Sequence, residues 1–268
     1  MDERLIQAKI EIEKKLKCFD DIKFSFDEES HTYKYDGRKF DSVTTFLKTF
    51  KTPFNRDYWS KKKAQERGVD VSVILNEWAV KSSRSLVIGT AVHKYIEDFW
   101  GQKEPIIPDD LDVFDRVQKF LELYDRKLNV FYPLKPELKV FSRRWRISGT
   151  IDQPLLYWDE KMDLPYLVIG DWKTNGEFKD DNHPKGRYKK LLRPFGHLYE
   201  NHHNEYSIQI SLYRLILEEE ANIRTQSGFL CHIGPDEPPK LYPAKDLREP
   251  LRAYLENNRA ELDIFDIG

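Results

Sequence analysis

The hydrophobic pattern of the chain changes near Leu138, and this change limits the fold more than any other feature. Before it, apolar residues recur three and four positions apart, as in the stripe over residues 85–99, which predicts helices. After it, residues 138–158 and 165–174 predict strands, the last of them short and buried. A helix, a strand and a helix follow, at residues 208–220, 229–234 and 248–262. This order predicts an α/β fold, with a central mixed β-sheet flanked by helices and a helical N-terminal extension.

The N-terminal third predicts a smaller unit that packs on the core. Residues 1–18 have helical spacing, and alternating aromatic residues around Asp36-Gly37 predict a hairpin. Ser42 is a candidate helix N-cap, and residues 56–82 predict a helix interrupted at Gly68. We expect an N-terminal region of residues 1–84 and a core of residues 85–268. We also expect a long loop at about 176–205, which is either a lid over a bound strand or a surface loop.

Composition excludes several classes of protein. The 268 residues, 40% of them hydrophobic, suffice for one sizeable core. No apolar run reaches the roughly 20 residues of a membrane helix, and the charged N-terminus is unlike a signal peptide. We therefore expect a cytoplasmic or nucleoid-associated protein, from a cell or a virus. With Cys18 and Cys231 alone, the chain lacks the cysteines for a disulfide framework, a cysteine zinc site or a four-cysteine iron–sulfur cluster.

A buried strand that ends in Asp171-Trp172-Lys173 is the first candidate for chemistry. Alternation along a strand places Asp171 and Lys173 on one face. A carboxylate there can bind a hard cation, and the ammonium can orient the attacking water. By itself, the tripeptide is more typical of a surface salt bridge that closes a strand.

A second carboxylate, Asp152, follows Ser148-Gly149, where we expect a turn or a bulge between two strands. Two carboxylates beside one lysine are costly to bury without a cation. On the preceding helix, His93 and Glu97 lie one turn apart, and Gly89 would let the helix approach the sheet. Each of these residues also has an ordinary alternative, as a turn aspartate, a surface histidine or a packing glycine.

The ordered set GTAVHKYIE, PELKVF, GTIDQ, GDWKT and QISLY resembles the PD-(D/E)XK nucleases, in their RecB-like branch. The resemblance covers roughly residues 85–220 and implies a restriction-endonuclease-like core. Upstream, HTYKYDGRKFDSVTTFLKTF resembles the N-terminal part of phage-type and mitochondrial genome maintenance exonucleases. The joint match, in order and at suitable spacing, is more specific than any single motif.

The resemblance implies a role for each matched residue. Asp152 and Asp171 would ligate Mg²⁺ or Mn²⁺, together with His93 and the backbone carbonyl of Trp172. Glu137 or Glu97 would support the metal. Lys173 would position the attacking water, and two residues on the following helix, Gln209 and Tyr213, would orient Lys173 and the DNA backbone.

The implied activity is hydrolysis of DNA phosphodiester bonds, by an exonuclease acting on single-stranded DNA or DNA ends. A structure- or sequence-selective endonuclease, and an inactive DNA-binding recombination accessory protein, are the alternatives. Two groups of residues are candidates for DNA contacts: basic residues for phosphates, and tryptophans as stacking platforms unless they belong to the core. The basic residues are Arg144, Arg146, Lys185, Arg187, Lys189, Lys190 and Arg193, and the tryptophans are Trp59, Trp145 and Trp172. The spacing of His197, His202, His203 and Cys231-His232 disfavours a zinc site.

Overall fold

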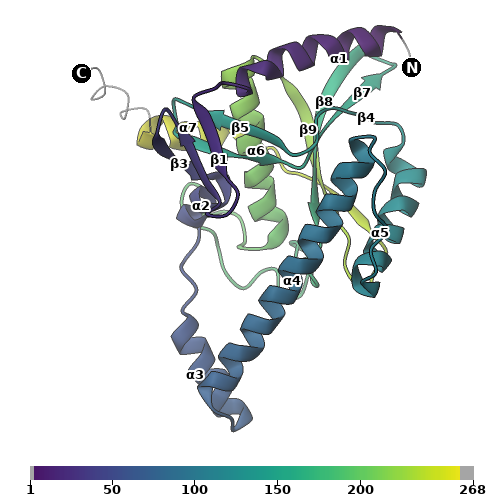
Figure 1. Ribbon diagram of the computed structural model, residues 1–268. Helices are drawn as coiled ribbons and strands as arrows, with labels where there is room; N and C mark the ends of the chain where they lie inside the picture. The colour runs from purple at the N-terminus through teal and green to yellow at the C-terminus, as the bar shows by residue number, and fades with distance from the viewer. Residues whose placement is uncertain (1–2, 260–268) are drawn as a thin grey trace.

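Two five-stranded sheets form the framework of the chain, which the computed structural model describes for residues 3–259 (Figure 1). The first sheet has the order β1(Phe24–Asp27), β2(Thr32–Tyr35), β3(Arg38–Ser42), β6(Ile147–Ile151) and β5(Leu138–Ser142). The second has the order β10(Lys240–Pro243), β9(Thr225–His232), β8(Leu164–Lys173), β7(Gln153–Asp159) and β4(Tyr132–Pro133). Neighbouring strands are antiparallel except β3–β6 and β8–β9. The mixed α/β class is confirmed, with the strands divided between two mixed sheets.

The two sheets meet where the chain bends at Asp152, between β6 and β7. The turn predicted at Ser148-Gly149 is wrong, because both residues lie within β6, and β5 and β6 are joined by residues 143–146 instead. Glycine is needed at 149 for a different reason. A Cβ there would lie 2.9 Å from Cε1 of Tyr213, so the small residue lets a helix approach the strand. The predicted hairpin at Asp36-Gly37 is confirmed, and both residues have the positive φ of such turns.

Seven α-helices surround these sheets within the described residues. They are α1(Glu3–Leu16), α2(Val43–Leu47), α3(Arg56–Arg67), α4(Val71–Trp100), α5(Leu111–Leu123), α6(His202–Ala221) and α7(Arg248–Arg259), with short helical turns η1(Lys17–Phe19), η2(Lys48–Phe50) and η3(Tyr124–Leu128). Ser42 caps α2 as predicted, by accepting a hydrogen bond from the Thr45 N–H at 3.0 Å. The predicted last helix is α7 up to residue 259, and its residues 260–262 lie outside the described part of the chain.

Helix α4 is longer than the sequence pattern predicts. The break at Gly68 is confirmed, where a φ of 63° ends α3. The helices predicted on either side of residues 83–84 are in fact one, because no proline interrupts the chain there. The domain boundary predicted between residues 84 and 85 falls inside α4, and the division into two domains stays a prediction. Figure 1 shows α3 and the first half of α4 extending away from the sheets.

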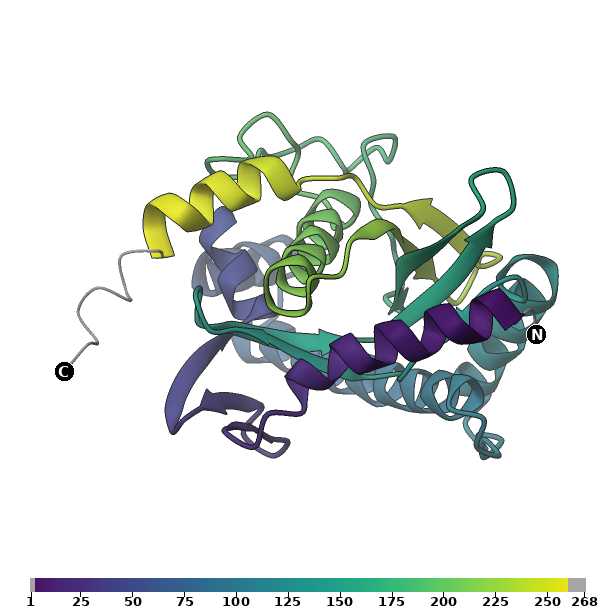
Figure 2. The ribbon, with the colours of Figure 1, turned by 90° about the horizontal axis from the view of Figure 1, so that it is seen from above.

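The core lies on both faces of the second sheet. Helices α4 and α5 cover one face, where Val92 and Phe120 pack with Trp172 of β8. Helix α6 contacts the other face and also reaches the first sheet, as the view in Figure 2 shows. Its apolar residues are buried nearly all round, which is what a helix enclosed by other elements requires. Strand alternation therefore points Trp172 toward α5, and Asp171 and Lys173 toward α6.

The segment predicted as a long loop at 176–205 packs onto the body of the protein. It ends at α6, which begins at residue 202 because the Asn201 side chain accepts from the Asn204 N–H. Phe195 is fully buried, and its ring meets Phe50 edge-on with centroids 4.9 Å apart. Asp181 accepts hydrogen bonds from the side chains of Asn201 and Asn204, at 2.8 and 2.9 Å. Among residues 3–259, no helix is both long and apolar enough to cross a membrane.

Candidate active site

A groove of about 890 Å³ runs past the junction of the two sheets. Its walls are the β1–β2 hairpin, the start of α2 and the second half of α4. Within residues 3–259, one group of three possible metal ligands comes together there, His93, Glu137 and Asp152. Their ligand atoms all lie within 4.8 Å of one another. Carboxylate oxygens and an imidazole nitrogen in such proximity suit a divalent cation.

The backbone of Trp172 holds two of these side chains in place. Its N–H donates to Oδ2 of Asp152 at 2.8 Å, and its carbonyl oxygen lies 3.0 Å from Nε2 of His93. Nδ1 of His93 lies 3.7 Å from Oδ2 of Asp152. Gly89 allows this approach of α4, because a Cβ there would lie 3.2 Å from Oγ1 of Thr174. The bend at Asp152, the strand β8 and the helix α4 thus converge on the backbone of one residue, Trp172.

Glu137 is held under both backbone and electrostatic strain. Its φ of 49° lies in the left-handed region, which costs a residue other than glycine about 1 kcal/mol. Its N–H donates to the Asp152 carbonyl at 2.9 Å, which fixes it beside the second carboxylate. Burial raises the pKa of Glu137 to about 8, and the charges of Asp152 and Glu97 add to this rise. A site that crowds buried anions in this way is stabilised by a bound cation.

Asp171 and Lys173 form a buried ion pair next to this group, with Nζ 2.6 Å from Oδ2. Burial raises the pKa of Asp171, Lys173 opposes the rise and Asp152 adds to it. Burial acts to lower the pKa of Lys173, but the carboxylates of Asp171 and Asp152 outweigh burial and raise it. The lysine is therefore a fixed positive charge beside the carboxylates.

Helix α6 contributes the residues predicted from its Gln-x-x-x-Tyr spacing. Nε2 of Gln209 donates to Oδ1 of Asp171 at 3.1 Å, so Gln209 holds the carboxylate that pairs with Lys173. Tyr213 is buried one turn later, and its ring lies against Gly149 of β6. Burial raises the pKa of Tyr213 well above its usual value, and Asp171 and Asp152 reinforce the effect.

Tyr206 is a site residue that the sequence reasoning missed. Its ring centroid lies 4.3 Å from Nζ of Lys173, which makes it the aromatic partner of the ammonium. It precedes Gln209 by three residues, so both lie on one face of α6. That spacing was the available signal, but an aromatic residue at helical spacing is usually part of a core.

Other predicted residues lie farther from this centre. Glu97 lines the groove but is outside the three-ligand group and pairs with Lys94 at 3.1 Å. Arg144 and Arg146 belong to the β5–β6 turn, at the end of these strands away from Asp152, and Arg144 lies 3.7 Å from Glu219. These two arginines are not brought to the groove.

The predicted basic residues of the long loop are exposed, but they do not line the groove. Lys189 pairs with Glu200 at 3.0 Å, and Lys190 donates to the His197 carbonyl at 2.8 Å. Arg187 donates to the carbonyl of Asp181. The exposed members of the set are Lys185, Arg187, Lys189, Lys190 and Arg193.

Two of the three candidate stacking platforms are wrong. Trp145 and Trp172 are 0% and 2% exposed, so neither offers a ring face to a ligand. Trp59, on α3, is 40% exposed. The pattern around Trp145 had suggested a basic surface, but its flanking arginines point outward from a buried ring.

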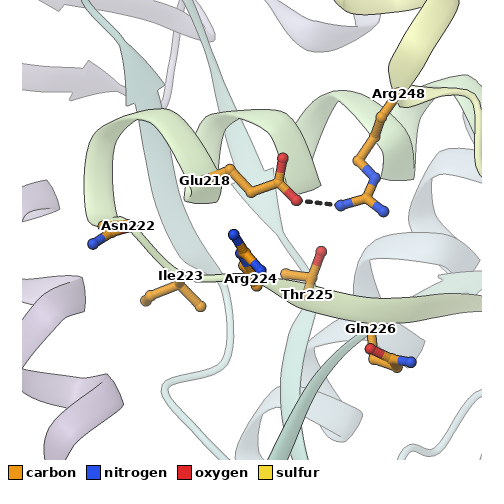
Figure 3. A pocket seen from close by; sticks show the side chains of 7 residues that line it. All are labelled: Glu218, Asn222, Ile223, Arg224, Thr225, Gln226 and Arg248. Atoms are coloured by element: carbon orange, nitrogen blue, oxygen red, sulfur yellow. Dashed lines mark hydrogen bonds and ion pairs between the residues drawn. The ribbon is translucent and has the colours of Figure 1, made fainter.

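A smaller pocket of about 330 Å³ lies where α6 ends and β9 begins (Figure 3). Glu218 and Arg248 pair across it, and Arg248 is also bound by Asp246. These charges are neutralised within the protein. The pocket therefore lacks the unbalanced carboxylates that distinguish the groove beside Asp152.

No protein-family model and no curated protein matches the chain. A solved structure from Eubacterium rectale, named "putative exonuclease", has a TM-score of 0.43 and 14% identity, over 83% of this chain and 79% of that chain. A likeness this distant carries no argument about the chemistry of the groove.

Proposed function

We propose that the chain is a metal-dependent deoxyribonuclease of the PD-(D/E)XK superfamily, in its RecB-like branch. One observation carries the proposal. Asp152 accepts its hydrogen bond from the peptide between Asp171 and Lys173, at 2.8 Å. The second carboxylate is thus fixed onto the backbone of the Asp-x-Lys strand, and Nε2 of His93 lies 3.0 Å from the carbonyl oxygen of the same residue, Trp172. Motifs far apart in the sequence meet at one point, which a chance surface salt bridge does not explain.

Mg²⁺ or Mn²⁺ would be held by Asp152, Asp171, His93 and the Trp172 carbonyl, with Glu137 as a further carboxylate. The donor set fits, because oxygen ligands dominate it and the crowded carboxylates of Glu97, Glu137, Asp152 and Asp171 outnumber the ammonium groups of Lys139 and Lys173 beside them. The Trp172 carbonyl accepts a hydrogen bond from His93 when Nε2 carries the proton, so binding of the ion by Nε2 would require the tautomer with its proton on Nδ1. When bound, the ion lowers the pKa of a coordinated water and polarises the phosphate.

The remaining chemistry belongs to side chains. Lys173 stays protonated, so its ammonium can orient the attacking water and stabilise negative charge that develops on the phosphate. Gln209 holds Oδ1 of Asp171, which leaves Oδ2 for Lys173. Tyr206 limits the positions that the ammonium can adopt.

DNA with single-stranded character or a free end is the proposed substrate, as the N-terminal resemblance implies. The groove has a volume of about 890 Å³, and residues of the β1–β2 hairpin line it together with the candidate metal ligands. The exposed basic residues of the 176–205 loop lie outside it. Phosphate contacts with them therefore require a DNA strand that extends beyond the groove.

End-labelled and end-blocked single- and double-stranded DNA, incubated with Mg²⁺ or Mn²⁺, tests the activity. We expect cleavage of free-ended single strands, stalling on blocked ends and no cleavage in EDTA. An endonuclease cuts both kinds of substrate, and an inactive DNA-binding protein cuts neither. Lys173→Ala should abolish cleavage, whereas Lys161→Ala, an exposed lysine in the β7–β8 turn, should leave it unchanged.

Thermal unfolding tests the metal site without relying on activity. A ligand present at about 100 times its Kd stabilises the folded state by about 2.7 kcal/mol. We expect Mn²⁺ to raise the Tm of the wild-type protein and not that of Asp152→Ala. An equal rise in both proteins would place the ion elsewhere.

A further inference from the structure

An aromatic cluster of the β1–β2 hairpin lines the same groove as the candidate metal ligands. Phe26 stacks on Tyr33 with ring centroids 4.5 Å apart. His31 meets both rings edge-on, at 5.2 and 5.7 Å. Tyr33 is buried, but Phe26 is half-buried and His31 is exposed, so the groove retains accessible ring surface. No step of the proposed hydrolysis uses these rings.

The hairpin holds this cluster at a fixed position relative to Asp152. Phe26 and Tyr33 face each other across the strands, which explains their stacking. Asp27 closes the turn by accepting from the N–H and the hydroxyl of Ser30, at 2.7 and 2.8 Å. The Tyr33 hydroxyl lies 3.1 Å from Oγ1 of Thr150, two residues before Asp152. A ligand stacked on the rings would thus lie at a fixed position relative to the candidate metal ligands.

The charges at this end of the groove favour a flat neutral ring over a phosphate. Glu28 lines the groove beside His31, and its carboxylate repels an anion. Lys139 lies between the rings and the carboxylates, with Nζ 5.3 Å from the Phe26 centroid. One ammonium at this point suits a single phosphate, between the rings and the metal ligands. The order along the groove is therefore aromatic rings, one positive charge and then the cluster of carboxylates.

We propose that Phe26 and His31 form a nucleobase-binding subsite. They stack the base of the second nucleotide along the strand from the phosphate that lies at Asp152, and Lys139 contacts the phosphate that joins the first of these nucleotides to the second. A base paired in a duplex has its faces covered by its neighbours, so the subsite selects an unpaired base. This inference rests on the proposed nuclease function and adds to it the element that recognises single strands.

Abasic substitution tests this subsite directly. In a set of labelled single-stranded oligonucleotides, one abasic residue is moved along the strand a position at a time, and kcat/KM is measured. In the wild-type protein we expect one position, the second nucleotide from the cleaved bond, where loss of the base lowers kcat/KM about tenfold. In His31→Ala and Phe26→Leu, cleavage of the intact strand should fall by a similar factor and the abasic effect should disappear. Phe114 is an exposed phenylalanine on α5, and Phe114→Leu is the matched control. This variant should keep both the cleavage rate of the intact strand and the abasic effect.

Equilibrium binding of the same oligonucleotides in EDTA separates this inference from the nuclease proposal. If the wild-type protein cuts nothing but binds intact strands more tightly than abasic ones, and His31→Ala loses that preference, the subsite stands and the nuclease proposal fails. If it cuts DNA and the abasic profile is flat, or unchanged in both hairpin variants, the subsite is refuted and the nuclease proposal stands. His31 is exposed, so we expect His31→Ala to fold even if Phe26→Leu does not. In that case His31→Ala alone decides the test.

Discussion

Two clusters of histidine and carboxylate lie around the end of β8, and they differ in what their atoms already bind. The groove cluster is His93, Glu137 and Asp152, whose ligand atoms converge. The loop cluster is His183, His202, His232 and Glu177. In it, Nε2 of His232 lies 2.6 Å from the Asn175 carbonyl, and Nδ1 of His202 accepts from the Lys179 N–H at 3.0 Å. His183 lies 3.2 Å from Glu177. The loop cluster contains more histidines, but they bind the loop itself.

The surrounding charge separates the two clusters further. In the groove, burial and Asp152 raise the pKa of Glu137 to about 8, which is the mark of crowded anions. In the loop, burial together with the positive charges of Lys179 and Lys51 lowers the pKa of His202 to about 4. A cation is favoured in the first environment and opposed in the second. Convergence of anions, and not the number of potential ligands, distinguishes the candidate metal site from the loop cluster.

The largest contrast is expected in catalysis. Asp152→Ala should lower kcat on single-stranded DNA by about a thousandfold or more, because a metal site contributes several kcal/mol to the transition state. His183→Ala, in the loop cluster, should change kcat less than twofold. Initial rates with Mn²⁺ measure both. Comparable losses of kcat in the two variants would mean that the groove cluster and the loop cluster do not differ in their role in catalysis.

Tyr206 lies between the clusters and sharpens the comparison. Its ring contacts Lys173 on the groove side and stacks on His202 at 5.9 Å on the loop side. We expect Tyr206→Leu to lower kcat roughly tenfold with little change in KM, since a cation–π contact of about 1–2 kcal/mol is lost from the ammonium. Tyr206→Phe keeps the ring and should restore most of the rate. If Tyr206→Phe loses as much kcat as Tyr206→Leu, then the Tyr206 hydroxyl, and not its ring, supports catalysis.

Glu137 gives the groove cluster a pH signature in the absence of metal. Its folded pKa of about 8 lies above the ordinary value of 4.5. The folded state therefore binds the proton more tightly, and stability is lost as pH rises from about 4.5 through 8. In EDTA, we expect Glu137→Gln to raise the Tm at pH 8 by about 3 °C or more, and to leave it little changed at pH 4. Glu160→Gln, which is exposed, should show no such pH-dependent gain.

The sequence predicted the arrangement of residues that are close in the chain, but not the contacts between elements that are far apart in it. Alternation placed Asp171 and Lys173 on one face, and helical spacing placed Gln209 and Tyr213 together, because both rules act over a few residues. The sequence did not predict that Gln209 would contact Asp171, or that Tyr206 would contact Lys173. Those contacts depend on how α6 packs between two sheets, which periodicity does not encode.

The errors have the same origin. Gly149 was taken as a turn residue, because glycine marks turns more often than it marks close approach of a helix. Trp145 and Trp172 were taken as stacking platforms because their burial, in the β5–β6 turn and on one face of β8, depends on the elements that pack against them and not on the local sequence. The fold class was predictable because it needs the order of elements alone. The division into two sheets, with Asp152 at their junction, was not.

The smallest effect is expected from the loop cluster itself. His202→Ala removes the acceptor of the Lys179 N–H, so we expect it to cost about 1 kcal/mol of unfolding free energy at pH 7 and to leave kcat within twofold. The lowered pKa of His202 has a consequence with the opposite sign to that of Glu137. Its neutral form is favoured in the folded state, so stability is lost as pH falls from the ordinary value of 6.5 through 4. Denaturant unfolding at pH 7 and pH 4.5 should therefore show the variant's deficit shrinking in acid. A deficit that grows in acid, or a large loss of kcat, would mean that the histidines of the loop serve the groove after all.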